Sequence, residues 1–269
     1  MTPELDLGAY CERIGFGGVM RPEFDTLAAL VRAHMASIPF ENLDVLLGRP
    51  VRLDLESLQA KLVRARRGGY CFEHSTLLAA VLERVGFRPV RHSARVTMAS
   101  PRSDAPRTHM FLTVPLDQGR FVVDAGFGSL APAFPVPLVD GKETHADETT
   151  HWMARDGDLW VLRARSGDKT VDGWVSTLEH DNPVDFEMAN HYVATHAASP
   201  FVNRILMRAL TSDGRVTVMN RDVTIWRDSI PHASQLADRA ALRVLLVEHF
   251  GFDLPEIERV RVRSIAEWV

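Results

Sequence analysis

The spacing of the apolar residues changes after Gly86, and this change constrains the fold more than any other feature of the chain. Before it, apolar residues recur every three to four positions, which is the spacing of an amphipathic helix. Helices are expected over Phe24–Met35, from Asp54 as N-cap to Gly68, and over Cys71–Val85, with Gly86 ending the last of them. The first 86 residues therefore predict a helical bundle.

After Gly86, apolar and polar residues alternate, which is the spacing of a half-buried strand. A last helix is expected from about Ser234 to Phe250, closed by Gly251. The sequence thus predicts an α+β, multi-domain chain, with a helical bundle over residues 1–86, an antiparallel sheet or barrel over 87–190 and a mixed α/β part over 191–269. The expected strands are 90–98, 109–114, 120–124, 151–155, 158–163, 215–219 and 223–227.

Composition excludes several classes of protein. Of the 269 residues, 46% are apolar and 25% are charged, which is typical of a globular protein and not of a disordered one. A net charge of −4 gives no reason to expect nucleic acid or an anionic membrane as a partner. The first ten residues show no secretory signal, and two cysteines cannot form a disulfide framework or a four-cysteine zinc site. We expect a cytoplasmic protein without a metal.

Cys71 is the first candidate for a reactive residue. It follows Gly68-Gly69-Tyr70 and stands on the first turn of an expected helix. The free backbone N–H groups and the dipole at a helix N-terminus favour the thiolate, which is the reactive form of cysteine. The alternative is a buried cysteine that only fills the junction. Cys11 lies in an amphipathic amino-terminal segment and is expected to serve packing only.

His109 and Asp124 offer a base beside that cysteine. His109 opens one expected strand and Asp124 closes the next. A four-residue loop at 116–119 would set His109 opposite position 126, so that Asp124 becomes its diagonal neighbour at about 7–8 Å by backbone. The side chains can then close the gap to a hydrogen bond, which predicts an imidazole oriented by a carboxylate. The alternative is two polar residues that meet water at strand ends.

The segment after Asp124 is rich in glycine and proline and contains two aromatic residues. It is either a surface loop or the wall of a binding pocket whose backbone N–H groups face a phosphate or a carbonyl. It is not a P-loop, because no Gly-Lys-Ser/Thr follows. The GxGxxG, CxxC and HExxH motifs are also absent from the sequence.

Several motifs together resemble one enzyme family. The Ile-Pro-Phe-Glu-Asn motif at 38–42 and the Arg-Gly-Gly-Tyr-Cys-Phe-Glu motif at 67–73 are specific. With them the chain resembles the arylamine N-acetyltransferases, which move an acetyl group from acetyl-CoA to aromatic amines and hydrazines. Ser75 stands where family members often carry asparagine, which leaves the nucleophile unaffected. The matching stretches, in order, are Tyr10–Phe16, His34 with Ile38–Asp44, Arg67–His74, Thr108-His109 with Asp124–Gly128 and, more weakly, Asn190–Phe201.

The resemblance assigns a role to each matching residue. It implies that Cys71 accepts the acetyl group, that His109 generates the thiolate and that Asp124 orients His109. It also implies a helical bundle, a β-barrel and an α/β lid around a Cys-His-Asp core like that of cysteine proteases. Acetyl-CoA would be the co-substrate in a ping-pong reaction, and the protein would be a monomer or a homodimer. The acceptor pocket would be lined by Phe127 and Phe201, and the acetyl-CoA cleft would lie near Gly126 and Gly128.

Two other functions remain open. The same three residues could serve a Cys-His-Asp amidase or a transglutaminase-like hydrolase, which passes its acyl group to water. A binding module with a decayed site is the non-enzymatic alternative, and the presence of all three residues counts against it. Glu41, Asn42 and Arg67 are expected to tie loops together, and Arg13 and Arg67 are candidate partners of Glu41 or Glu73.

Overall fold

The chain begins with a group of helices and continues into two sheets. The computed structural model describes residues 4–98, 100–146, 149–212, 214–228 and 230–268. The three helices expected before Gly86 are confirmed, although the second ends at Arg64, before the glycine pair. The helices before the first strand are α1 (Leu7–Ile14), α2 (Phe24–Ser37), α3 (Leu43–Leu46), α4 (Leu55–Leu58), a π-helical continuation (Gln59–Arg64) and α5 (Cys71–Val85).

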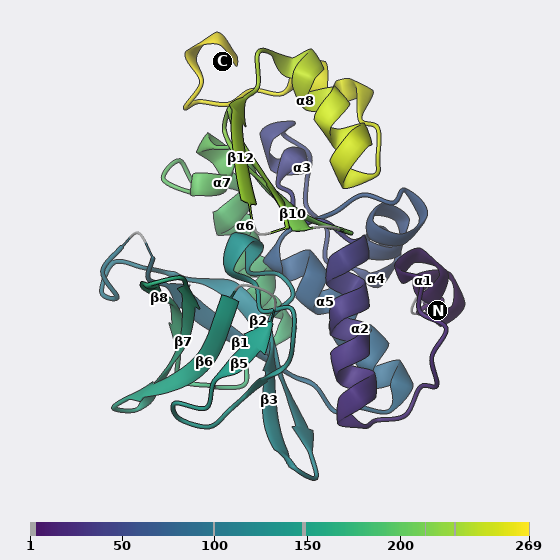
Figure 1. Ribbon diagram of the computed structural model, residues 1–269, viewed down its shortest axis with the longest axis vertical. Helices are drawn as coiled ribbons and strands as arrows, with labels where there is room; N and C mark the ends of the chain where they lie inside the picture. Colours follow the sequence, from purple (N-terminus) through teal and green to yellow (C-terminus); the bar gives the residue numbers. More distant parts are fainter. Residues whose placement is uncertain (1–3, 99, 147–148, 213, 229, 269) are drawn as a thin grey trace.

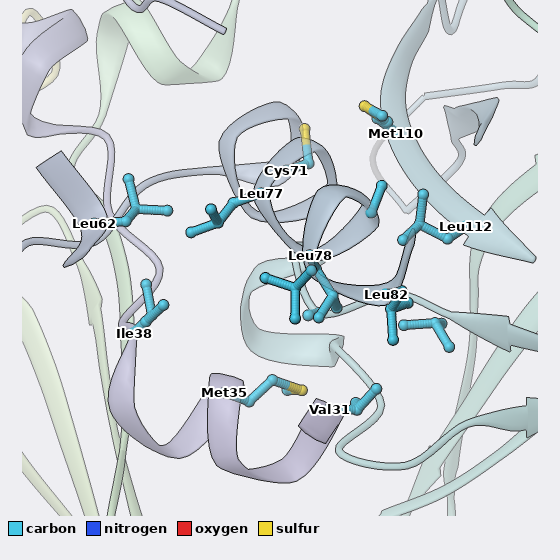
Figure 2. Packing of buried hydrophobic residues seen from close by; sticks show 14 of the residues in the cluster. Val31, Met35, Ile38, Leu62, Cys71, Leu77, Leu78, Leu82, Met110 and Leu112 are labelled. Carbon is cyan, nitrogen blue, oxygen red and sulfur yellow. The ribbon is translucent and has the colours of Figure 1, made fainter. Parts of the chain in front are cut away.

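Helix α5 lies at the centre of the main hydrophobic core. The Asp54 carboxylate caps α4 by accepting from the Ser57 N–H at 2.9 Å, and Gly86 ends α5 with a φ of +105°. Such a φ is open to glycine and strained for other residues. Leu78 and Leu82 of α5 are fully enclosed between α2 and the large sheet (Figure 2). This packing fixes the position of Cys71 at the N-terminus of the same helix.

The large sheet has eight antiparallel strands in the order β4-β3-β2-β1-β8-β7-β6-β5. A parallel bridge between Asp140 and Met153 brings the two ends of the sheet towards each other, so that it forms a nearly closed barrel. The predicted barrel and its hairpins are confirmed, and β8 is a strand that the sequence did not reveal. The strands are β1 (Val90–Val96), β2 (Arg107–Leu116), β3 (Gly119–Val123), β4 (Val136–Pro137), β5 (Thr144–Ala146), β6 (Thr149–Asp156), β7 (Leu159–Ser166) and β8 (Lys169–Ser176).

The last part of the chain contains two helices, a four-stranded antiparallel sheet and a further helix. Two of the strands were expected from the sequence, but the helix expected from Ser234 is wrong at its start. Residues 230–235 form an exposed edge strand instead, and the helix begins after Asp238, whose carboxylate accepts from the Ala241 N–H. The elements are α6 (Pro183–Thr195), α7 (Pro200–Asn203), β9 (Leu206–Thr211), β10 (Gly214–Met219), β11 (Asp222–Arg227), β12 (Ile230–Gln235), α8 (Arg239–Leu245) and a π-helical turn (Leu246–Phe250).

Figure 1 shows how these parts meet: the large sheet lies at the lower left, helices α1, α2, α4 and α5 at the right, and the small sheet with α3 and α8 at the top. Phe40, in the segment that follows α2, pairs with Arg208 of β9 through two backbone hydrogen bonds of 2.8 and 2.9 Å. The small sheet is thereby joined directly to the helical part. Among the described residues, no helix is both long and apolar enough to span a membrane. The α+β class expected from the sequence is confirmed.

Candidate active site

Cys71 occupies the first position of α5 and is 3% exposed. The Glu73 carboxylate accepts from the Tyr70 N–H at 3.0 Å, which closes the first turn of the helix. A methyl group on Gly126 would lie 2.6 Å from the Cys71 Cα, so only glycine allows the loop after β3 to approach this closely. The thiol therefore stands at a helix N-terminus, enclosed by the loop that follows Asp124.

The β2–β3 hairpin brings His109 and Asp124 together. Its register pairs Leu112 with Val123 and Leu116 with Gly119, and the same register would set His109 opposite Gly126. His109 Nε2 lies 2.9 Å from Asp124 Oδ2, and both side chains are almost fully buried. The diagonal arrangement and the hydrogen bond are those that the sequence predicts.

Trp174 is a third contact in this group, and the sequence did not point to it. Its indole Nε1–H donates to Asp124 Oδ2 at 2.8 Å, so that one carboxylate oxygen accepts from both Trp174 and His109. The Trp174 ring is fully buried and stacks on Phe111 with a centroid distance of 4.1 Å. Trp174 therefore fixes which carboxylate oxygen faces the imidazole.

The charge of His109 follows from these contacts. Burial alone would lower the pKa of His109, but the Asp124 carboxylate and a hydrogen bond with Cys71 act against it and raise that pKa to about 10. The imidazole is therefore protonated at neutral pH. Since Nε2 is bound to Asp124, Nδ1 is the nitrogen left to face Cys71. A cationic imidazole beside a thiol is an arrangement that stabilises thiolates in general.

A cavity of about 650 Å³ opens on Cys71 and His109. Its walls come from the segment before α3, the loops on either side of the β2–β3 hairpin, α6, α7 and the small sheet. All four residues proposed from the resemblance as pocket or cleft residues line it: Gly126, Phe127, Gly128 and Phe201. The Phe127 ring lies 4.8 Å from the His109 ring, and Phe201 lies 5.4 Å from Tyr70, both measured between centroids.

The lining is mainly apolar, which fits an organic ring better than an ion. Phe40 belongs to it as well, and its ring centroid lies 6.2 Å from that of Phe201. Phe40 belongs to the sequence motif at 38–42, which does not by itself predict a position in the pocket. Gly128 has a φ of +57°, and this left-handed turn carries the loop from Phe127 past Phe40. In the part of the chain that the structure describes, no cluster of three or more His, Cys, Asp or Glu side chains could hold a metal ion.

An ion cluster supports the turn before Cys71. Arg67 forms ion pairs of 2.6 Å with Glu41 and Asp44, and Lys61 forms ion pairs of 2.7 Å with Asp44 and Glu73. The expected pairing of Arg67 with Glu41 is confirmed. These four ion pairs tie the glycine pair to the segments before and after it.

The expected pairing of Arg13 is wrong, and the expected loop-tying role of Asn42 is confirmed. Arg13, on α1, donates to the backbone carbonyls of Leu62 and Arg66, within and just after the π-helical segment, and not to Glu41 or Glu73. Asn42 donates to two carbonyls and accepts from the Leu206 N–H, which ties α7 and β9 to the helical part.

Replacing Trp174 by phenylalanine is expected to lower the free energy of unfolding by about 1–3 kcal/mol. The change removes one hydrogen bond to a buried carboxylate and leaves that oxygen with His109 alone. Urea unfolding of the variant measures the loss. Trp160→Phe on β7 is the matched control, since its ring is half-buried and packs against Arg155. Equal losses in the two variants would contradict the contribution assigned to this hydrogen bond.

Known proteins resemble the chain over nearly its whole length. A family model described as N-acetyltransferase matches residues 23–260. The arylamine N-acetyltransferase of Mycolicibacterium smegmatis is 39% identical over 259 residues, covering 94% of each chain. That of Escherichia coli is 35% identical over 260 residues, covering 95% of this chain and 91% of the relative.

Solved structures agree with the sequence matches. The arylamine N-acetyltransferase of Mycobacterium tuberculosis superimposes with a TM-score of 0.88 at 37% identity, covering 94% of this chain and 96% of that one. The Mycobacterium marinum enzyme in complex with CoA gives a TM-score of 0.88 at 34% identity, covering 94% of each chain. The resemblance carried by the sequence motifs is confirmed: this chain belongs to the arylamine N-acetyltransferase family of acyltransferases.

Proposed function

We propose that this chain transfers the acetyl group of acetyl-CoA to aromatic amines and hydrazines through an acetyl intermediate on Cys71. The observation that carries the proposal is the His109–Asp124 hydrogen bond beside a thiol that opens on a mainly apolar cavity. The names of the relatives support aromatic amines as acceptors, and the M. marinum complex with CoA supports CoA as the carrier of the acetyl group. In this scheme Cys71 is the nucleophile, His109 moves protons and Asp124 holds His109.

The first half-reaction loads the enzyme. The Cys71 thiolate attacks the acetyl carbon of acetyl-CoA, a new C–S bond forms at Sγ, and the bond from the acetyl carbon to the CoA sulfur breaks. The proton on His109 Nδ1 passes to the departing CoA thiolate, so CoA leaves as a thiol and the imidazole becomes neutral. Asp124 accepts from His109 Nε2–H throughout and keeps this tautomer in place.

The second half-reaction unloads the enzyme in the same cavity. The nitrogen of the acceptor attacks the acetyl carbon, the bond to Cys71 Sγ breaks, and the amine proton passes to the neutral His109. The products are the N-acetylated amine and the original thiolate–imidazolium pair. Because one cavity serves both substrates in turn, the kinetics should be ping-pong, with parallel double-reciprocal lines.

The remaining parts of the cavity receive roles in the same proposal. Phe127 and Phe201 hold the aromatic ring of the acceptor. Gly126 and Gly128 have no side chains to project into the cavity, which leaves room there for acetyl-CoA. The small sheet serves as the lid of the cavity. Met207 of β9 and Thr217 of β10 line the cavity, which supports this role. The division into residues 1–86, 87–190 and 191–269 stays a proposal, and its second border falls within α6. The cytoplasmic location and the oligomeric state stay predictions.

Anilines and arylhydrazines are expected to outcompete aliphatic amines as acceptors. Flat apolar walls favour an aromatic ring, and the higher basicity of aliphatic amines keeps them protonated and non-nucleophilic at neutral pH. Competition between an aniline and a lysine-like amine at equal concentration measures the preference. If the aliphatic amine is acetylated faster, the assignment of Phe127 and Phe201 to the acceptor wall is wrong.

The hydrolase is the alternative that an assay must separate from the transferase. Release of CoA from acetyl-CoA is followed with and without an aromatic amine. A transferase releases CoA continuously only when the amine is present, and at most one equivalent per enzyme without it. A hydrolase that uses water consumes acetyl-CoA at the same rate in both samples, and that result would overturn the proposed function.

A further inference from the structure

Three buried side chains that the proposed mechanism does not use form a continuous hydrogen-bonded chain behind the site. The Tyr10 hydroxyl lies 2.9 Å from His34 Nδ1, and His34 Nε2 lies 2.8 Å from His74 Nδ1. His74 Nε2 lies 3.2 Å from the carbonyl oxygen of Pro39. All three side chains are at most 1% exposed. We call this group, from the Tyr10 hydroxyl to the Pro39 carbonyl, the Tyr10–His74 chain.

The donors and acceptors of the Tyr10–His74 chain can be assigned in one direction only. A carbonyl oxygen only accepts, so His74 Nε2 carries the proton at that end. Burial lowers the pKa of His74 to about 4 and that of His34 well below its usual value, so both rings are neutral. His74 Nδ1 then accepts from His34 Nε2–H, and His34 Nδ1 accepts from the hydroxyl of Tyr10. Every polar atom along the path is used once.

The end of the Tyr10–His74 chain lies at the wall of the cavity. The Pro39 carbonyl that accepts from His74 also accepts from the Gly69 N–H at 3.2 Å, two residues before Cys71. The next residue, Phe40, lines the cavity, and its ring lies parallel to the His74 ring with 6.5 Å between centroids. His74 itself is one turn after Cys71 on α5. The Tyr10–His74 chain thus connects α1, α2 and α5 to Phe40, a residue of the pocket.

We propose that the Tyr10–His74 chain is a positioning device that holds Phe40 in the acceptor wall without touching substrate. The proposal rests on the proposed function, because the effect it assigns is on binding of the aromatic acceptor. The backbone of Phe40 is bound to the small sheet. On the side that faces α5, the Pro39 carbonyl and the His74 ring hold the Phe40 ring towards the cavity. The turn that carries the nucleophile is held in addition by Glu73 and the ion cluster, none of whose residues belongs to the Tyr10–His74 chain.

Tyr10→Phe, His74→Leu and His74→Gln test the proposal. Tyr10→Phe removes one hydroxyl, keeps the ring and leaves His34 Nδ1 without its donor. His74→Leu removes both hydrogen bonds of that ring, whereas His74→Gln keeps one donor and one acceptor and should restore part of the function. The matched control is Thr113→Val, which removes the hydroxyl 2.8 Å from the buried His92 on β1, away from the cavity lining.

Each variant is measured for KM and kcat with an aniline, for the melting temperature and for the alkylation rate of Cys71 by iodoacetamide. Tyr10→Phe and His74→Leu should raise the KM for the aniline about five- to tenfold, with kcat within about twofold and alkylation unchanged. His74→Gln should restore part of the function, with a KM between those of the wild type and of His74→Leu. Thr113→Val should lower the melting temperature as much as Tyr10→Phe does and leave KM unchanged. If His74→Leu does not fold, Tyr10→Phe and His74→Gln still decide the result.

Two outcomes would overturn the inference. One is an unchanged KM in Tyr10→Phe together with a melting temperature lowered as much as in Thr113→Val. This result would mean that the Tyr10–His74 chain only stabilises the core. A changed alkylation rate would mean that it acts on Cys71 and not on the acceptor wall. An inactive wild-type protein would instead refute the proposed function, so the two failures are distinguishable.

Discussion

Replacing Cys71 by alanine is expected to reduce acetyl transfer to aromatic amines roughly a million-fold, which is the size of the loss when a serine triad loses its nucleophile. The proposed reaction needs a covalent bond to Sγ in both half-reactions, so no partial pathway remains. The fold should be kept, because the change removes one sulfur atom from the edge of a core that Leu78 and Leu82 fill deeper along α5. A continuous assay of CoA release with an aniline measures the loss.

Cys11→Ala is the matched control for this variant. Cys11 is the other cysteine of the protein. It lies half-buried on α1 and does not line the cavity. Its replacement should leave the rate of acetyl transfer within about twofold of wild type. A Cys71→Ala protein that still acetylates amines would refute the proposed mechanism, whatever the effect of the Cys11 change.

Asp124→Asn is expected to slow formation of the acetyl-enzyme by up to about 10⁴-fold, by analogy with the same change in a serine triad. The substitution keeps the size of the side chain and removes its charge. Trp174 and His109 both donate to one oxygen, so the asparagine amide oxygen should take that place, leaving its NH₂ at the site of Oδ1, a buried atom without a partner. The pKa of His109 then falls, because its main raising interaction is gone.

The pH profile of Cys71 alkylation reports this loss of charge. In the wild type the pKa of His109 is raised to about 10, so the imidazolium persists from the acid side up through neutral pH. The rate of reaction with iodoacetamide should therefore be high at pH 7 and change little up to about pH 8.5, where free thiols ionise. In Asp124→Asn the rate should be low at pH 7 and rise towards that pH.

The same variant separates two roles for Asp124. If the carboxylate only supports the Gly-Phe-Gly loop that follows it, Asp124→Asn should lower the melting temperature and leave alkylation at pH 7 near wild type. Measuring both quantities on one sample decides between the roles. Normal alkylation would remove Asp124 from the proposed triad.

Local sequence signals predicted the parts of the site that depend on neighbours along the chain. The helix Cys71–Val85 is bounded by glycines at both ends, so its limits were found correctly. The position of His109 relative to Asp124 follows from the length of one turn, and the β2–β3 register agrees with it. Both features rest on interactions within about 20 residues, where spacing alone carries the geometry.

The parts that were missed depend on contacts between distant segments or on broken patterns. Strand β8 carries Trp174. Asp172 and Gly173 interrupt the alternation of apolar and polar residues in this strand, next to a bulge in the β7–β8 pairing. Edge strand β12 is exposed along its length and lacks an apolar face, so it was not expected, and the helix was expected to begin at Ser234, inside its last two residues. The place of Phe40 in the cavity depends on Arg208, far along the sequence, and no local pattern contains that pairing.

Mass spectrometry of the protein after incubation with acetyl-CoA alone is the most direct test of the central claim, that Cys71 carries the acetyl group between donor and acceptor. The proposed mechanism predicts one added acetyl group per chain, located on the peptide that contains Cys71, with release of one equivalent of CoA. Adding an aniline should then remove the group and yield the acetylated amine. An unmodified Cys71 in a protein that acetylates amines under the same conditions would contradict the account.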